Sequence, residues 1–404
     1  MPPEIDCLIA GAGFAGSALA LALAQRGLSV GLVEARGPLP ATGGTDVRGL
    51  VLVPSSKRLL ADLDLWRELA PHAAPIRHVH VSDRGRFGFT RFSHEALGVP
   101  ELGHVCPADR LAAALDAALL AAPIVRHWSS CVTAVRPGET GIEVDIAGAE
   151  GAVTLRARLL VGADGARSRV RVCCGIPAAR HDYGQRAIVA NLDVARPAPA
   201  IAFERFTPDG PLAILPLVDR RVVTVCTVPD AEAEGVLALT DAAYLDYVHA
   251  RFGDRLGRFS NLGRRSAFPL ELVRAATLVA PRTVLVGNAA NAIHPNGAQG
   301  LNLGLRDVAT LAAMLAAARA AGADPGGAAL LAAYAARRRP QQRRVVCFSD
   351  ALARVFRSDF PPLVHGRDAV MLALDLLPGV KKHLGRRLMG IARFDGDLLA
   401  GDRS

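Results

Sequence analysis

The sequence predicts an α/β fold in three parts: a parallel-sheet domain, a strand-rich insert and a C-terminal run of helices. Apolar runs that end in glycine-rich turns recur at residues 5–16, 160–165 and 283–300, as expected where parallel strands lead into helices. Residues 183–228 instead show short strands separated by turns, and residues 328–400 show helical patterning. With 404 residues, 51% of them hydrophobic, the chain can bury a large core.

The first glycine-rich turn follows a predicted strand over residues 5–10 and precedes a predicted helix that ends near Arg26. Its G-x-G-x-x-G spacing lets the backbone turn sharply and approach a pyrophosphate at the helix N-terminus. The next strand, over residues 29–36, ends with a carboxylate about 20 positions on, where it can accept hydrogen bonds from ribose hydroxyls. This context predicts a dinucleotide site formed by Gly11, Gly13, Gly16 and Glu34.

Two further turns of the same kind occur far along the chain. Residues 160–171 (LVGADGARSRVR) follow a predicted hairpin, and by themselves they could be an ordinary Asp-Gly turn. Residues 287–307 (GNAANAIHPNGAQGLNLGLRD) end an apolar strand and lead directly into a helix. Three such turns suggest one long ligand that is contacted three times. A nicotinamide dinucleotide needs only the first turn, whereas FAD also needs its ribityl chain and flavin ring held.

Charge and cysteine content narrow the functional class. The formal net charge is +9, and residues 333–404 hold 14 Lys/Arg against 7 Asp/Glu. Few aromatics and no basic helix interleaved with them disfavour nucleic acid as a partner. Seven cysteines without a C-x-x-C spacing argue against a disulfide framework or a zinc site, so we expect no metal and a cytoplasmic location. Residues 8–24 look like a signal peptide, but acidic residues precede them and glycines interrupt them.

The three turns, in this order and spacing, resemble those of the single-component (class A) FAD aromatic hydroxylases, which share the p-hydroxybenzoate hydroxylase fold. The resemblance extends to VHVSDRGRFGF (79–89), AFERFTPDGPLAILPL (202–217) and FPPLVHGRDAVMLALDLLPGVKKHLGRRLMG (360–390). It covers nearly the whole chain. Within that group the sequence is most similar to the bacterial ubiquinone-biosynthesis hydroxylases, in the 2-polyprenyl-6-methoxyphenol hydroxylase branch.

The resemblance implies a Rossmann-like FAD-binding domain, a β-sheet-rich substrate domain that forms a roof over the flavin, and C-terminal helices. The FAD-binding domain is expected to be discontinuous. The expected bounds are 1–70, 98–178 and 273–325 for the FAD-binding domain, 71–97 and 179–272 for the substrate domain, and 326–404 for the C-terminal helical region.

The resemblance also assigns cofactor contacts. The glycines of the first turn are expected at the pyrophosphate, with Glu34 and the nearby Arg36 at the adenosine end. Arg48 is expected to pair with an FAD phosphate or ribose, and Asp164 with Gly165 to reach the pyrophosphate region. Asn288 is expected to hydrogen-bond the ribityl hydroxyls, since an amide can both donate and accept.

The third turn is expected to carry the flavin ring. A flat ring against backbone excludes large side chains, which explains Gly297, Ala298 and Gly300. The amides of Leu301 and Asn302, at the start of the helix, should face the flavin edge that becomes anionic on reduction. The turn reads HPNGAQGLN, whereas the ubiquinone branch usually reads HPIAGQGLN, and this change bears on the substrate pocket.

Pro295 and His294 are the candidate catalytic residues. Pro295 is expected to hold the turn over the reactive edge of the flavin. His294 is a candidate general base, and the alternative is that it only shapes the turn. No Ser-His-Asp set, paired carboxylates or metal cluster is evident elsewhere, which fits a reaction whose hard chemistry belongs to the cofactor.

The implied reaction is hydroxylation of a phenolic ring by O₂ through a flavin C4a-hydroperoxide, with a hydrophobic, polyprenylated phenol of ubiquinone biosynthesis as substrate. NAD(P)H is expected to act as a transient reductant because no second G-x-G-x-x-G occurs, or another protein supplies the electrons. The alternatives are a natural-product aromatic hydroxylase or epoxidase of the same fold, and a non-catalytic flavin-binding subunit of a biosynthetic complex.

Basic clusters at 336–346 and 376–390 lie next to Leu, Val and Met residues. Such clusters bind anionic membrane surfaces, so the sequence suggests peripheral attachment to the inner face of the cytoplasmic membrane. The alternative is a solvated helical face, in which long basic side chains cover neighbouring apolar surface.

Overall fold

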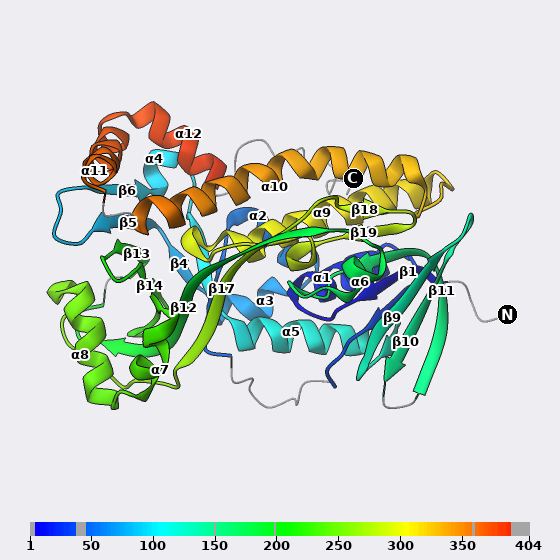
Figure 1. The fold of residues 1–404 in the computed structure, drawn as a ribbon, viewed down its shortest axis with the longest axis horizontal. Helices are drawn as coiled ribbons and strands as arrows, with labels where there is room; N and C mark the ends of the chain where they lie inside the picture. Colours follow the sequence, from blue (N-terminus) through cyan, green and yellow to red (C-terminus); the bar gives the residue numbers. More distant parts are fainter. Residues whose placement is uncertain (1–4, 38–45, 149–150, 198, 358–359, 389–404) are drawn as a thin grey trace.

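The computed structural model describes residues 5–37, 46–148, 151–197, 199–357 and 360–388. Its first sheet has a parallel centre in the order β19-β11-β1-β2-β8, flanked by the antiparallel strand β18 and by the hairpin β9–β10 (Figure 1). The strands are β1 (Ile5–Ala10), β2 (Val30–Val33), β8 (Ile124–His127), β9 (Ser130–Pro137), β10 (Ile142–Gly148), β11 (Gly151–Gly162), β18 (Val279–Ala280) and β19 (Thr283–Leu285).

Three helices accompany the first sheet: α1 (Phe14–Ala24), α5 (Ala108–Ala121) and α9 (Gln299–Ala320). Every residue of α1 from Gly16 to Leu23 is buried, because α5 and α9 pack against it. The apolar run at residues 8–24 is therefore part of the domain core. Helix α9 is long and apolar enough to cross a membrane, but 67% of its most apolar window is buried inside the protein, as in a core helix.

The second sheet is mostly antiparallel and runs β20-β17-β12-β15-β14-β13-β5-β6, with β16 beside β12. Its long strands β12 and β17 extend toward the first sheet (Figure 1). The bounds are β5 (His78–Asp83), β6 (Phe89–Ser93), β12 (Ala178–Val194), β13 (Ile201–Phe206), β14 (Leu212–Pro216), β15 (Arg221–Pro229), β16 (Phe259–Ser260), β17 (Ser266–Ala275) and β20 (Asn291–Ala292).

Side chains alternate between the two faces of this sheet. One face carries Phe203, Ile214 and Cys226, which pack in one core cluster with residues of α7 (Asp230–Ala238) and α8 (Asp241–Phe252). The other face carries Val189 and Ala202, which belong to a different cluster. We call this second face, on β12 to β15 and β17, the roof.

A small sheet lies between the two large ones, with β7 (Gly103–Pro107) paired to both β3 (Gly49–Leu52) and β4 (Ala74–Ile76). Four short helices complete this part of the fold and the strand connections around it. They are α2 (Pro54–Asp62), α3 (Trp66–Leu69), α4 (His94–Leu97) and α6 (Arg169–Cys173).

The C-terminal helices are α10 (Ala328–Arg357), α11 (Pro361–Leu376) and α12 (Pro378–Leu388). Helix α10 packs on α9, and its Arg338 forms a buried ion pair with Asp307 at 2.7 Å. Helix α11 packs on β6 and α12 on α4, so the end of the described chain returns to the second sheet (Figure 1). Residues 389–404, the end of the expected C-terminal region, lie outside the described residues.

The three sheets divide the chain somewhat differently from the expected domain bounds. The segment 273–325 is expected to belong to the FAD-binding domain. Two parts of it, the short strand β20 and the end of β17, instead pair within the second sheet. Likewise β4, within 71–97, belongs to the small sheet. Both differences arise where the chain passes from one sheet to another, where sequence patterns carry little signal. The domain bounds stay a prediction.

Candidate active site

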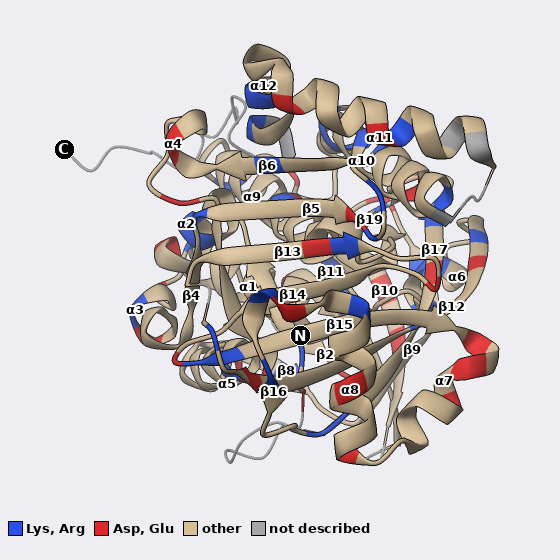
Figure 2. Cartoon of the chain, turned by 90° about the vertical axis from the view of Figure 1, so that its left-hand side faces the viewer, with Lys and Arg blue, Asp and Glu red and all other residues tan. Residues whose placement is uncertain are grey.

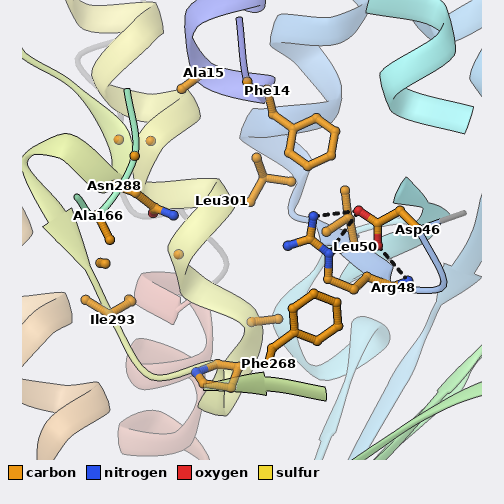
Figure 3. A pocket seen from close by; sticks show the side chains of 18 of the residues that line it. Phe14, Ala15, Asp46, Arg48, Leu50, Ala166, Phe268, Asn288, Ile293 and Leu301 are labelled. Atoms are coloured by element: carbon orange, nitrogen blue, oxygen red, sulfur yellow. Dashed lines mark hydrogen bonds and ion pairs between the residues drawn. The ribbon is translucent and has the colours of Figure 1, made fainter. Parts of the chain in front are cut away.

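A cavity of about 1150 Å³ lies between the ends of the first-sheet strands and the roof. All three glycine-rich turns line it, together with β3 and the facing residues of β12, β13, β14, β15 and β17. Figure 3 shows part of this lining, with Asn288, Ile293 and Leu301 of the third turn facing Arg48 and Phe268. Segments far apart in the sequence therefore meet around one cavity.

In the first turn, the three glycines differ in position. Gly11 has a φ of +103°, and a Cβ there would lie 2.6 Å from the Ala163 oxygen of the second turn. A Cβ at Gly13 would meet nothing within 4 Å, and Gly13 lines the cavity. Gly16 does not line the cavity, and a Cβ there would lie 1.9 Å from the Gly11 oxygen. Gly16 thus allows α1 to pack on the turn, and its expected place at the pyrophosphate stays a prediction.

Glu34 directly follows β2, and two backbone amides hold its carboxylate. Its Oε2 accepts a hydrogen bond from the Ala12 amide at 2.6 Å, and its Oε1 accepts one from the Arg36 amide at 3.0 Å. The Arg36 guanidinium lies 3.5 Å from Glu34 Oε1, but its side chain is 77% exposed. Both residues line the cavity at its first-turn end.

Arg48 projects from the segment before β3 and is fixed from two sides. It donates to both carboxylate oxygens of Asp46, the shortest contact being Nη2 to Oδ2 at 2.6 Å. Its guanidinium also lies 5.2 Å from the centroid of the Phe268 ring on β17 (Figure 3). The sequence reasoning missed Asp46 and Phe268, although Asp46 lies only two positions before Arg48.

In the second turn, Asp164 has one engaged and one free oxygen. Its Oδ2 accepts hydrogen bonds from the amides of Arg169 and Val170 at 2.7 and 3.0 Å, at the start of α6. Its Oδ1 is buried at the cavity without a partner in the described part of the chain. Gly165 has a φ of +81°, and a Cβ there would meet nothing within 4 Å.

The third turn combines a short 3₁₀ turn, Asn296–Ala298, with the start of α9 at Gln299, two residues before the expected start. Gly297 and Ala298 both have positive φ, 70° and 51°. This conformation is costly for alanine and indicates a backbone that the surroundings hold in place. Both residues line the cavity, as do Asn288, Gly300 and Leu301.

Asn302 does not line the cavity, and its side chain is fully buried. Its Nδ2 donates to the Val51 and Ala298 oxygens at 2.8 Å each, and its Oδ1 accepts from the Val53 amide and the Ser56 hydroxyl. The asparagine therefore ties the start of α9 to β3 and α2. These are side-chain contacts, and the expected role of the Asn302 backbone amide at the flavin edge stays a prediction.

His294 is also outside the cavity lining, with only 1% of its surface exposed. Its ring packs edge-on against Tyr183, and its Nδ1 accepts a hydrogen bond from the Asn296 amide. Burial lowers the pKa of His294 to about 4, so the ring is neutral near pH 7. His294 thus packs against the turn outside the cavity lining, which favours the alternative that it shapes the turn, while its general-base role stays a prediction. Pro295 does line the cavity.

The roof supplies the cavity residues that the sequence reasoning did not single out. Most are apolar, and the clearest exception is a glutamate on β13. The sequence signal for it is weak, because β13 reads IAFERF and has no hydrophobic–polar alternation that would assign Glu204 to one face. These residues include Val189, Ala202, Glu204, Ala213, Leu215, Val225, Phe268 and Leu270.

The lining fits FAD on structural grounds. Gly13, Gly165 and Gly297 come from the three different turns, and at each a Cβ would project into open space. Asp164 Oδ1 and Asn296 Nδ2 are buried polar atoms at the cavity that lack partners among the described residues. Backbone that a long ligand can approach at three places, with free polar groups beside it, is what a flavin dinucleotide requires.

The FAD binding domain family matches residues 4–349. The chain is 37% identical to the ubiquinone hydroxylase UbiL of Rhodospirillum rubrum, over 96% of this chain and 90% of that one. It is 33% identical to the 3-demethoxyubiquinol 3-hydroxylase of Escherichia coli, over 78% of this chain and 80% of that one. The fold is similar to that of p-nitrophenol 4-monooxygenase PnpA from Pseudomonas putida (TM-score 0.79, 17% identity, 97% of this chain and 99% of that one).

These matches confirm the predicted fold class and FAD as cofactor. The chain therefore belongs to the FAD binding domain family and is an FAD-dependent monooxygenase.

Proposed function

We propose that this monooxygenase hydroxylates the ring of a polyprenylated phenol in ubiquinone biosynthesis. The observation that carries the proposal is that the cavity formed by the FAD turns continues beneath an apolar roof. A hydrophobic phenol can lie there next to the flavin. The names of the UbiL and 3-demethoxyubiquinol 3-hydroxylase relatives support a ubiquinone precursor over other phenols.

FAD, when bound, supplies the activation of O₂ that no amino-acid side chain provides. The chain's residues bind and orient the two reactants and exclude water, which would otherwise divert the oxidising equivalent. NAD(P)H is consistent with this class as the reductant, and we propose that it binds only transiently.

We propose the following contacts for the cofactor. The first turn and β2 bind its adenosine and pyrophosphate, the second turn and Arg48 bind the region next to them, and the third turn supports the ribityl chain and ring. The residues, in that order, are Gly11, Gly13, Glu34, Arg36, Arg48, Asp164, Gly165, Asn288, Pro295, Gly297, Gly300 and Leu301. All of them line the cavity.

Complementation tests the substrate class. The gene is introduced into bacteria that lack one ubiquinone hydroxylase at a time, and their quinone intermediates are identified by mass spectrometry. The proposal predicts that one intermediate disappears and ubiquinone returns. If every deficient strain keeps its intermediate while the expressed protein carries FAD, the substrate lies outside this pathway. Structural neighbours such as the anhydrotetracycline hydroxylase OxyS, at 24% identity, support the shared fold only.

We further propose that the enzyme meets its substrate at an anionic membrane surface through α11 and α12. Leu376 and Leu377 are 74% and 53% exposed, and the exposed Lys382 follows on α12. The basic residues lie mainly on α12 (Figure 2), because the one Arg of α11, Arg367, is paired with Asp83. Apolar side chains beside basic ones match the interface of an anionic membrane.

The two basic clusters do not contribute equally. In the first, Arg338 is buried in its ion pair with Asp307, and Arg339 donates to the Ala276 oxygen. In the second, Lys381 pairs with Asp375 at 2.6 Å. These contacts leave fewer basic groups for a membrane than the sequence suggested. The apolar residues Leu376 and Leu377 are therefore the more direct test.

Vesicle flotation tests the membrane proposal. The wild type should float with anionic vesicles, less so at high salt, and Leu376→Ser combined with Leu377→Ser should reduce the floated fraction. Val172→Ser is the matched control, because Val172 is 72% exposed on α6, away from α11 and α12 (Figure 1). Equal recovery of the wild type with neutral and anionic vesicles, or none with either, would contradict the proposal.

A further inference from the structure

Glu204 lies on β13, the outermost strand of the roof, in a row of apolar side chains. Strand pairing aligns it with Val81 on one side and Ala213 on the other, and the row continues through Val225 to Val189. Directly paired residues share a face of the sheet. Glu204, Ala213, Val225 and Val189 all line the cavity. A carboxyl group thus faces the place where we propose that the substrate ring lies.

The Glu204 carboxyl has no hydrogen-bond or ion-pair partner among the residues that the structure describes. Its side chain is half-buried, and the cavity is the space on its face of the sheet. Burial raises the pKa of Glu204 to about 7. A buried carboxyl group without a partner lowers the stability of the folded protein, so its presence here suggests a function. A pKa near the working pH is typical of groups that act in acid–base catalysis.

The charged groups on neighbouring strands are turned away or engaged. On β5, His80 lies on the opposite face of the sheet, where the centroid of its ring is 6.0 Å from that of Phe203. Asp83, further along β5, pairs with Arg367 of α11 at 2.7 Å. Arg205 alternates with Glu204 and so faces the other side of the sheet. Strand β14 contributes no titratable side chain.

Titratable groups on β15 and β17, and Arg48 on the opposite wall, are also engaged. On β15, Cys226 faces α8 and accepts a hydrogen bond from Arg251. On β17, Glu271 pairs with Arg180 of β12 at 3.5 Å. On the opposite wall, Arg48 is paired with Asp46. Among the roof residues that the structure describes, Glu204 is therefore an acidic group without a partner on a mostly apolar surface.

We propose that the Glu204 carboxylate accepts the proton of the substrate's phenolic hydroxyl, an inference that rests on the proposed function. The phenol O–H bond breaks, an O–H bond forms on a Glu204 carboxylate oxygen, and the electron pair stays on the phenolate oxygen. Nothing is oxidised or reduced in this step. The phenolate is a stronger carbon nucleophile than the phenol, so the ring reacts more readily with an electrophilic oxygen. The proton leaves with the product or through water.

The test measures the rate at which three proteins hydroxylate two phenols. The proteins are the wild type, Glu204→Gln and Glu271→Gln. One phenol ionises near pH 10, like tyrosine, and the other is acidic enough to be ionised throughout the assay range. With the first phenol, the wild-type rate should fall as the pH drops through about 7, where Glu204 becomes protonated. Glu204→Gln should be slower by about 100-fold or more at pH 7.5, and its rate should rise with the phenol's own ionisation.

With the acidic phenol, the difference in rate between the wild type and Glu204→Gln should shrink to a few-fold. The fall in the wild-type rate as the pH drops through about 7, which we call the pH limb, should disappear. Glu271→Gln removes a carboxylate that already has a cationic partner, and its pH profile should follow the wild type. Flavin content and thermal unfolding are measured for each variant. If Glu204→Gln does not fold, the wild-type comparison of the two phenols still decides, because the limb must appear with one phenol only.

Four outcomes separate the two proposals. If the wild type hydroxylates both phenols with the same pH limb, or if folded Glu204→Gln keeps the wild-type rate and profile, the role of Glu204 is wrong. If Glu204→Gln slows both phenols equally, Glu204 acts on something other than the phenolic proton, and the inference is again wrong. If FAD-loaded wild type hydroxylates no phenol, the proposed function fails, and this role fails with it.

Discussion

The two walls of the cavity are built differently. The floor consists of three glycine-rich turns from the first sheet, where backbone and a few fixed polar groups face the cavity. The roof consists of side chains from one face of a mostly antiparallel sheet, most of them apolar, with Glu204 and the ion-paired Glu271 as acidic exceptions. A floor made of backbone is constrained by geometry, and a roof made of side chains is free to vary. We expect the floor to determine the cofactor and the roof to determine the substrate.

The largest effect should come from a substitution inside the floor. Gly16→Val places a branched side chain where even a Cβ would lie 1.9 Å from the Gly11 oxygen. Because α1 cannot move without disturbing its packing on α5 and α9, we expect a loss of about 3 kcal/mol or more in stability. Denaturant unfolding of the apoprotein measures it. Wild-type stability would show that α1 is less tightly packed than the structure indicates.

Gly13→Val should separate cofactor binding from folding. The position has open space at its Cβ and lines the cavity, so the apoprotein should fold with nearly wild-type stability. The new side chain would occupy the proposed pyrophosphate position, and FAD affinity should fall on the order of 100-fold, or about 3 kcal/mol. Flavin fluorescence titration measures the affinity. Unchanged FAD binding would mean that the pyrophosphate lies elsewhere.

Glu204→Gln should change how stability depends on pH. The folded-state pKa of Glu204, about 7, is raised above the ordinary value of 4.5, so the folded state binds this proton more tightly. The wild type therefore loses stability as pH rises from about 4.5 to about 7, by roughly 1–3 kcal/mol. The variant should lack this loss. Melting temperatures of both apoproteins across this range measure it, and parallel curves would place Glu204 in water.

Ala213→Phe should have the smallest effect, and that effect should be limited to substrate binding. It enlarges a roof side chain next to Glu204 and Val225 without touching the three turns. We expect about a tenfold rise in KM for a bulky phenol, or about 1.4 kcal/mol, with FAD affinity unchanged. Steady-state kinetics and flavin titration measure the two quantities. A matching loss of FAD would show that roof and floor are not independent.

The floor could largely be predicted from the sequence because its signals are local. Each turn combines a strand end, glycines and a helix start within a few residues, and the structure places all three at one cavity. The structure adds most at residues whose surroundings depend on packing. Gly16, Asn302 and His294 stand inside the right motifs, but only the three-dimensional structure shows that they contact neighbouring protein and not the cavity.

The roof could not be predicted in the same way. Which face of a strand lines a cavity depends on pairing between strands far apart in sequence, as in the row that joins Glu204 to Val189. The same reason explains why Phe268 was missed, since only folding brings β17 next to Arg48. Long-range register is thus the information that a single sequence supplies least.

A single-turnover experiment with ¹⁸O₂ tests the central claim that this cavity hydroxylates a phenol. The FAD-loaded enzyme is reduced photochemically, which removes any dependence on the identity of the electron donor, and is then mixed with a prenylated phenol and ¹⁸O₂. We predict one product whose mass has increased by a single ¹⁸O atom on the ring. Reoxidation that yields only hydrogen peroxide, with the prenylated phenol recovered unchanged, would contradict the claim.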